Sequence, residues 1–321
     1  MKKAAYSQNG GRAERGGKHL KKLLFVYNPH SGKGAIGQSL SEIICRFTYG
    51  GYDVTVHPTR EHCDGQSYIR DHAAEYDTVV ASGGDGMLHE MFCGLYEAGI
   101  KMPCGYIPAG TVNDFASSLK IPKVPAEAAD IIVAGNFREL DAGIFNDTVF
   151  SYVAAFGMFT KVSYETDQRM KNALGAAAYF IEVLKSLDPK SFRESTVHAS
   201  ISFGGETHED DFIYGMVCNT LSVGTLTGIV PQGAKMDDGL LEGVFIKSPK
   251  NLIELDSIRN ALVTGNLDIP GIVYAKSASF TIDTGHEIEW TLDGEYGGSH
   301  SHADIHVREK SVSIAVPAGT L

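Results

Sequence analysis

The chain has 321 residues, of which 43% are hydrophobic and 21% charged, and this length is sufficient for two domains with separate cores. Because no run of about 18 apolar residues occurs, the sequence contains no candidate membrane-spanning helix. The formal net charge of −11 argues against a nucleic-acid-binding protein, since phosphate contacts require a basic surface.

The N-terminal segment has a charge opposite to that of the rest of the chain. Residues 1–22 contain seven Lys or Arg and one acidic residue, Glu14, so this segment carries a net +6 and the remainder −17. It lacks the apolar centre of a secretory signal, and the five cysteines show no C-x-x-C spacing; both features favour a cytoplasmic protein with reduced thiols. We expect residues 1–20 to be a disordered basic tail, which either aids solubility or holds the protein peripherally at the inner face of a membrane.

From residue 21 on, short apolar strands alternate with amphipathic helices. The strands are expected at 23–27, 52–56, 77–81 and 104–107, and the helices at 36–47, 67–75 and 87–98. This alternation predicts an α/β fold class, with a doubly wound parallel sheet over residues 21–141. In such sheets, ligands bind at the carboxyl ends of the strands.

After residue 141 the pattern changes to strands separated by turns, which predicts a mainly antiparallel β domain over residues 142–309. One long helix is expected at 162–187, ending before Asp188-Pro189, and a second at 252–264. Whether the last strand, within 310–318, returns to the first domain is left open. The other strands are expected at 149–155, 196–203, 212–218, 241–246, 278–282 and 288–292.

The first motif, Asn28-Pro29-His30-Ser31-Gly32-Lys33-Gly34, lies between a buried strand and a helix. Its glycines allow the backbone to approach an anion, and the N–H groups at the start of the helix favour a phosphate. Gly32, Gly34 and Gly37 also match the dinucleotide fingerprint G-x-G-x-x-G, but the acidic residue expected after the second strand is not evident. A Walker P-loop is excluded, because Lys33 is followed by glycine.

The second motif, Ser82-Gly83-Gly84-Asp85-Gly86-Met87-Leu88-His89-Glu90, also follows a buried strand and opens a helix. Its glycines make room for a phosphate chain, while Asp85 adds a negative charge that suits a metal ion or a substrate hydroxyl. The simpler alternative is that Asp85 caps the helix. The third motif, Pro108-Ala109-Gly110-Thr111-Val112-Asn113-Asp114-Phe115, follows the next strand, so all three loops are expected at one sheet edge.

In chain order, these motifs resemble the diacylglycerol kinase catalytic-domain family, which includes bacterial lipid kinases and the sphingosine and ceramide kinases. They read N-P-x-S-G-x-G, G-G-D-G and P-x-G-T-x-N-D-F-A. Two later segments, Pro231 to Leu241 and Leu292 to Glu295, resemble the family's P-x-A-x-x-D-D-G-L and L-D-G-E motifs. The G-G-D-G turn alone is shared with NAD kinases and phosphofructokinases. The resemblance implies their type of nucleotide-binding fold and an ATP-dependent lipid kinase that uses Mg²⁺.

The resemblance also assigns ligand roles to individual residues. A structural Mg²⁺ is expected on the Asp238 carboxylate and the main-chain oxygens of Lys235 and Leu240. The ATP site is expected to contain Asn28, Pro29, His30, Ser31, Gly32, Thr59, Gly83, Gly84, Asp85, Gly86, Met87, Leu88, His89, Thr111 and Asn113.

The same resemblance makes Asp293 the candidate base for the lipid hydroxyl, with Glu295 beside it and Asp85 across the cleft. Which of Asp293 and Glu295 accepts the proton is left open. So is the lipid, because diacylglycerol, a polyprenol, phosphatidylglycerol and a sphingoid base all present a hydroxyl near an apolar body. Two other functions stay open, namely a soluble-metabolite kinase of the NAD kinase type and a catalytically silent nucleotide sensor. Whether the chain assembles into a homodimer is also left open.

Two further features bear on these expectations. Met87 and His89 stand where bacterial members often have Thr and Asn, and they resemble the sphingosine kinase version of the loop. Near the C-terminus, potential metal ligands occupy every second position, so that a strand would bring them onto one face. They are His300, His302, Asp304 and His306. That segment is rich in Gly and Ser, however, and we expect it to be a surface loop.

Overall fold

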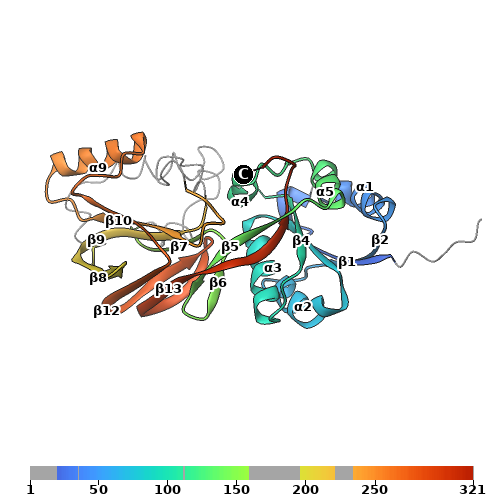
Figure 1. Ribbon diagram of the computed structural model, residues 1–321, viewed down its shortest axis with the longest axis horizontal. Helices are drawn as coiled ribbons and strands as arrows, with labels where there is room; N and C mark the ends of the chain where they lie inside the picture. Colours follow the sequence, from blue (N-terminus) through green and yellow to red (C-terminus); the bar gives the residue numbers. More distant parts are fainter. Residues whose placement is uncertain (1–19, 35, 111–112, 159–195, 221–233, 321) are drawn as a thin grey trace, which may run out of the picture.

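The computed structural model describes residues 20–34, 36–110, 113–158, 196–220 and 234–320. Within these residues the chain forms two lobes that lie side by side (Figure 1). The long helix expected at 162–187 and Thr111 of the third motif lie outside the described residues. No helix of the described residues is long and apolar enough to cross a membrane.

The first lobe is a parallel sheet whose central strands have buried, apolar middle parts because helices cover both faces of the sheet. Leu23 to Val26 and Val79 to Ala81 have no exposed surface. The strands run in the order β4 (Pro103–Pro108), β3 (Thr78–Gly83), β1 (Lys21–Tyr27), β2 (Tyr52–Pro58). One face carries α1 (Ile36–Tyr49) and α5 (Pro125–Ala134), and the other carries α2 (Asp64–His72), with a 3-10 turn at Ala73–Glu75, and α3 (Asp85–Glu97) (Figure 1).

The second lobe is a mainly antiparallel sheet with one described helix packed on it. Its largest buried side chain, Trp290, lies against Phe145 and Phe156, with ring centroids 4.8 and 4.9 Å away. The elements are β5 (Phe137–Phe145), β6 (Thr148–Phe150), β7 (Val153–Gly157), β8 (Val197–Phe203), β9 (Glu206–Cys218), β10 (Leu241–Lys247), α9 (Leu252–Thr264), β11 (Ile272–Ser277), β12 (Ser279–Leu292) and β13 (Glu295–Ala315). The predicted fold class, a doubly wound domain followed by a β-rich one, is confirmed.

Strand β13 joins the two lobes into one hydrogen-bonded sheet. Its first part pairs antiparallel with β12, and its end pairs parallel with β4, at Ser313 and Ile314. Strand β5 runs antiparallel beside it across the same junction. The register of this pair shifts between Arg308 and Val312, where Lys310 has a φ of 48°, so the strand is bulged where it passes from one lobe to the other.

Three expectations for the second lobe need correction. The strand expected at 149–155 is broken at Ser151 and Tyr152 into β6 and β7. The two strands expected between 278 and 292 are one strand, β12, with an irregularity between Asp283 and Ile288. The segment from His300 to His306 is part of β13 rather than a loop, because β12 pairs with it and β5 joins on the other side from Ile305 on.

Candidate active site

The three Gly-containing loops leave the carboxyl ends of β1, β3 and β4 and meet at one edge of the sheet. Asn28 N donates to Ser82 O (3.0 Å), and Ala109 N donates to Gly83 O (2.7 Å). A Cβ atom on Gly110 would lie only 2.5 Å from Gly84 Cα. The glycines therefore let the loops pack backbone against backbone, in addition to making room for a phosphate.

The first loop begins with a tight turn beside β2. Asn28 Oδ1 accepts a hydrogen bond from His30 N (2.8 Å), and a 3-10 turn at Ser31–Gly34 follows. Gly32 has a φ of 57°, and a Cβ there would lie 2.5 Å from Ala109 O of the third loop. Thr59, at the end of β2, donates its N–H to Tyr27 O (2.9 Å), which puts it next to this loop.

Several side chains of the expected ATP set are buried, so these residues have only main-chain atoms to offer a nucleotide. Met87 and Leu88 are at most 5% exposed and belong to the core of the first lobe. Asn113, 1% exposed, holds the third loop together: its Oδ1 accepts from Gly110 N (3.0 Å), and its Nδ2 donates to Gly110 O (2.7 Å). Thr111 lies outside the described residues.

Asp85 is the first residue of α3 and is aimed into the site. The helix is capped by Gly84 without a side-chain hydrogen bond, so Asp85 does not cap it; Oδ2 instead accepts from Asp114 N (3.3 Å), at the start of α4 (Asp114–Ser118). Among the described residues, the buried Oδ1 has no hydrogen-bond partner. Burial, the Asp114 carboxylate and the Asp293 carboxylate raise the pKa of Asp85 to about 6.

Asp293 lies in a two-residue turn between β12 and β13, in which Leu292 pairs with Glu295. Both turn residues, Asp293 and Gly294, have positive φ (53° and 89°), as a type I′ hairpin requires. The Asp293 side chain has no exposed surface. Its carboxylate extends from the turn into the break between β6 and β7.

Five donors occupy the Asp293 carboxylate. Oδ1 accepts from Tyr152 N (2.9 Å) and Val153 N (3.0 Å). Oδ2 accepts from Ser151 N (2.7 Å), Ser151 Oγ (2.8 Å) and His89 Nδ1 (2.7 Å). Burial by itself opposes ionisation of this group, but His89 and the backbone donors outweigh it and lower the pKa of Asp293. The strand break at Ser151 is therefore explained, since three consecutive N–H groups turn toward one carboxylate.

Glu295, two residues further on, is exposed and lies over the first turn of α3. Its Oε1 is 3.1 Å from the position that a Cβ on Gly86 would occupy. No hydrogen bond or ion pair joins its carboxylate to another described residue. The second lobe thus brings a free carboxylate to the same turn of α3 that holds Asp85.

The Asp-Asp-Gly turn that resembles the family's metal motif is rigid. Asp141 Oδ2 accepts from Gly239 N (2.7 Å), and Asp141 Oδ1 accepts from Lys310 N in the bulge of β13 (2.7 Å). Asp238 Oδ2 lies 2.8 Å from Lys276 Nζ, which is also 3.2 Å from Glu242 Oε1. Glu242 is fully buried, and neither carboxylate oxygen has a well-aligned hydrogen bond within the described part of the chain.

This turn suits a hard cation, although the described residues contain no ready-made cluster of three His, Cys, Asp or Glu ligands. A carboxylate from Asp238 and main-chain oxygens from Lys235 and Leu240 are the ligand types that Mg²⁺ prefers. The buried carboxylate of Glu242, next to Asp238 and paired with Lys276, adds negative charge to this place.

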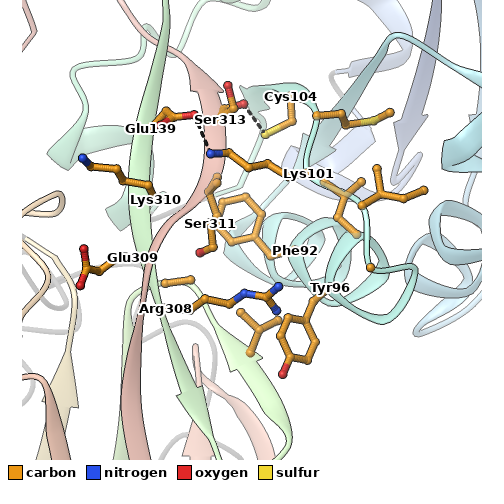
Figure 2. Close-up of a pocket in the computed structure, with 17 residues that line it drawn as sticks. Phe92, Tyr96, Lys101, Cys104, Glu139, Arg308, Glu309, Lys310, Ser311 and Ser313 are labelled. Carbon is orange, nitrogen blue, oxygen red and sulfur yellow. Dashed lines mark hydrogen bonds and ion pairs between the residues drawn. The ribbon is translucent and has the colours of Figure 1, made fainter.

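A cavity of about 440 Å³ lies at the far end of α3 from Asp85 and is separate from the phosphate loops. Figure 2 shows its two walls, with Phe92 and Tyr96 of α3 on one side and β13 on the other. Arg308 extends into it, and its guanidinium carbon lies 5.0 Å from the centre of the Tyr96 ring. The cavity adjoins the start of β4, whereas the loops follow its end, so we do not assign it to the nucleotide.

The structure adds residues to the site that sequence patterns did not indicate. Ser151, Tyr152 and Asp141 hold the two acidic turns, yet none belongs to a motif, and their partners are 98 to 169 residues away in the chain. His89 was expected at the nucleotide, but its imidazole faces Asp293. Only the hairpin signal Asp-Gly between two strands could have indicated the turn at Asp293.

Comparison with known proteins matches both lobes to described families. Residues 22–145 match "Diacylglycerol kinase catalytic domain", and residues 153–316 match "YegS C-terminal NAD kinase beta sandwich-like domain". A diacylglycerol kinase of Staphylococcus carnosus is 30% identical over 282 residues, covering 87% of this chain and 90% of the relative. A diacylglycerol kinase of Staphylococcus haemolyticus is 31% identical over 277 residues, which cover 85% of this chain and 82% of the relative.

Two solved structures from Bacillus anthracis share the fold. One covers 98% of this chain and 100% of its own, with a TM-score of 0.81 at 24% sequence identity. The other, a diacylglycerol kinase, covers 94% and 99% with a TM-score of 0.74 at 23% identity. Motif order, fold and sequence identity agree, and the chain belongs to the diacylglycerol kinase family.

Proposed function

We propose that this protein transfers the γ-phosphate of ATP to the hydroxyl group of a diacylglycerol. The observation that carries the proposal is the meeting of Asp85 and Glu295, from different lobes, at the first turn of α3. Phosphoryl transfer depends mainly on positioning and on charge at the reacting groups. A cleft with phosphate-binding loops on one side and a free carboxylate on the other supports this reaction.

The loops of the first lobe bind ATP in this proposal. Gly32 of the first loop and Gly84–Gly86 at the start of α3 offer main-chain N–H groups, and the N-terminus of α3 favours negative charge. The lipid hydroxyl enters from the side of the second lobe, which carries Glu295. The lipid oxygen then bonds to the γ-phosphorus, the bond from that phosphorus to the β–γ bridging oxygen breaks, and ADP leaves.

Glu295 accepts the hydroxyl proton, and Asp293 positions the hairpin that carries it. A carboxylate has about four lone-pair sites, and the five donors around Asp293 leave none for a substrate. Glu295 is exposed and has no partner among the described residues. The unpaired Oδ1 of Asp85 is a second acceptor, suited to orient the hydroxyl.

Asp238, with the main-chain oxygens of Lys235 and Leu240, would hold a structural Mg²⁺. When bound, the ion would supply positive charge that stabilises the acidic turn. Lys276 has to release Asp238 for this to occur. Its ammonium group can remain with Glu242, which needs a cation partner because it is buried.

Contact with a membrane surface follows from the substrate. We propose a cytoplasmic enzyme that works at the inner membrane face, with the basic residues 1–22 attracted to anionic headgroups. Vesicle sedimentation of the full chain and of a variant lacking residues 1–19 tests this contact, and light scattering shows whether the chain is a monomer or a homodimer.

One assay tests the function and its alternatives together. The purified chain is incubated with labelled ATP, Mg²⁺ and a panel of acceptors, including diacylglycerol in mixed micelles, a sphingoid base, phosphatidylglycerol, a polyprenol and NAD. We expect label in the diacylglycerol product. Label in NAD would instead indicate a soluble-metabolite kinase, and label in no acceptor a nucleotide sensor.

A further inference from the structure

An imidazole of the first lobe binds the buried Asp293 carboxylate of the second lobe. His89 lies one turn after Asp85 on α3, in the first lobe, and its Nδ1 is 2.7 Å from Asp293 Oδ2, in the second. The four other donors to the Asp293 carboxylate come from the Ser151–Val153 segment of the second lobe itself. Among the described residues, His89 is thus the only contact from α3 to this carboxylate.

The other side of the imidazole is occupied too. Its Nε2 lies 3.4 Å from Cys93 Sγ, and the same sulfur lies 3.7 Å from the main-chain oxygen of Val149, in β6. The His89 side chain is only 14% exposed. With both ring nitrogens engaged, His89 has no nitrogen left for a nucleotide, and its contacts lead from α3 into the second lobe.

The position of Glu295 depends on this contact. Asp293 and Gly294 form the two-residue turn, and Glu295 follows directly after it. The distance of Glu295 from α3 is therefore set by the position of the turn relative to the helix. The His89 bond ties the turn to the helix one turn after Asp85. Without it, the hairpin remains attached to Ser151–Val153 but loses its hydrogen bond to α3, which leaves the position of Glu295 relative to Asp85 less tightly fixed.

Electrostatics favour the charged imidazole. Burial opposes the imidazolium, but the hydrogen bond and charge of Asp293, with a smaller contribution from Cys93, raise the pKa of His89 well above its usual value. Cys63, which precedes α2, also interacts with His89, and the charges of Glu90 and Glu295 act on the same thiol. A neutral His89 would leave the Asp293 charge uncompensated beside Asp85 and Glu295.

We infer that His89, as an imidazolium, is a positioning residue that clamps the Asp293 turn onto α3 and thereby places Glu295 opposite Asp85. The inference rests on the proposed kinase function. Because the pKa of His89 is raised, the clamp stays complete above the ordinary titration range of histidine and weakens as the pH rises through the raised value, where Asp293 loses its counter-charge.

Two substitutions separate the hydrogen bond from the charge. The Asn side chain has a nitrogen at the same distance from Cβ as Nδ1 of His, so His89→Asn keeps a donor for Asp293 without the charge. His89→Ala removes both. His302→Asn is the matched control, because His302 Nδ1 also binds an aspartate, Asp283, at 2.6 Å, but both side chains are 57% exposed and distant from α3.

The kinetics are measured with a short-chain diacylglycerol between pH 6 and 9. We expect His89→Ala to lower kcat at least about tenfold with the KM for ATP changed less than about twofold, and His89→Asn, which keeps a donor but not the charge, to recover only part of that loss at pH 7. The decline of parental kcat at alkaline pH should disappear in His89→Asn and persist in His302→Asn. A raised KM for ATP at unchanged kcat would instead make His89 a nucleotide contact and overturn the inference.

Nitrogen NMR of the histidine-labelled protein provides a test that does not need activity. His89 should keep both ring N–H protons at pH 7.5, and this signal should shift or vanish in Asp293→Asn. A neutral imidazole at pH 7.5 refutes the clamp, even if the parent is an active kinase. An inactive parent with a protonated His89 refutes the proposed function alone.

Discussion

Replacing Asp293 by Asn tests whether this carboxylate is structural or chemical. The substitution conserves shape but turns one acceptor oxygen into an NH₂ donor. If the NH₂ replaces Oδ1, it faces the N–H groups of Tyr152 and Val153; if it replaces Oδ2, it faces Ser151 N–H and His89. In either orientation at least one buried backbone donor loses its acceptor, and the imidazolium loses its counter-charge.

The size of the effect follows from these contacts. Each buried unsatisfied donor costs about 1 to 3 kcal/mol, and removing one partner of a buried ion pair costs about 3 to 5 kcal/mol. These costs overlap, so we expect Asp293→Asn to lower the free energy of unfolding by about 3 to 5 kcal/mol. At about 2 to 4 °C per kcal/mol for a chain of this size, the melting temperature should fall by roughly 10 °C.

Urea unfolding at pH 7 and calorimetry measure the effect, and Asp283→Asn is the control. Asp283 also binds a histidine, but the pair is exposed, so its loss should change stability little. A variant Asp293→Asn that stays within about 1 kcal/mol of the parent, yet loses more than about 100-fold in kcat, would refute the structural role. It would make Asp293 the proton acceptor instead of Glu295.

Three further outcomes are expected. Glu295→Gln should lower kcat by about 100-fold or more without changing the melting temperature, because the carboxylate is exposed and unpaired among the described residues; an unchanged kcat would remove it as the base. Asp85 has a pKa of about 6, so the kcat of the parent should fall as the pH drops below 6. Asp85→Asn should abolish turnover. The same variant should raise the free energy of unfolding at pH 7.5 by about 2 to 3 kcal/mol, and this gain should shrink toward pH 4, where the carboxyl group is neutral in the folded parent. Mg²⁺ should raise the melting temperature of the parent more than that of Asp238→Ala, and equal shifts would exclude Asp238 as a ligand.

The elements that the sequence predicted well are those whose signals are local. Buried runs such as Leu23 to Val26 and helical spacing such as that of Ile43 and Phe47 identified the parallel sheet and its helices. Local signals were also available for α5, which begins with Pro125 and is followed by Gly135 in the left-handed conformation. This helix was not predicted, because its apolar residues are mostly alanines and its helical periodicity is weak.

The features that sequence reasoning missed depend on distant partners. The break at Ser151 exists because a carboxylate 142 residues further along accepts its N–H, and nothing near Ser151 indicates this. Strand β5 pairs with β13, again far along the chain. His89 was grouped with the nucleotide residues because of its place in the G-G-D-G motif, and only the position of Asp293 shows what its ring contacts.

The L-D-G-E motif shows why two acidic residues two positions apart have different roles. On a straight strand, residues two apart point to the same face, so both carboxylates would compete for one place. The turn at Asp293 and Gly294 breaks this relation, because both residues have positive φ and Glu295 is already the first residue of the returning strand. Asp tolerates this backbone better than Glu and is short enough to reach three N–H groups below the turn. The longer and exposed Glu295 reaches across to α3. The hairpin thus turns Asp293 toward the protein and Glu295 toward the cleft, and the charge that stabilises the turn is not the one that has to accept a proton.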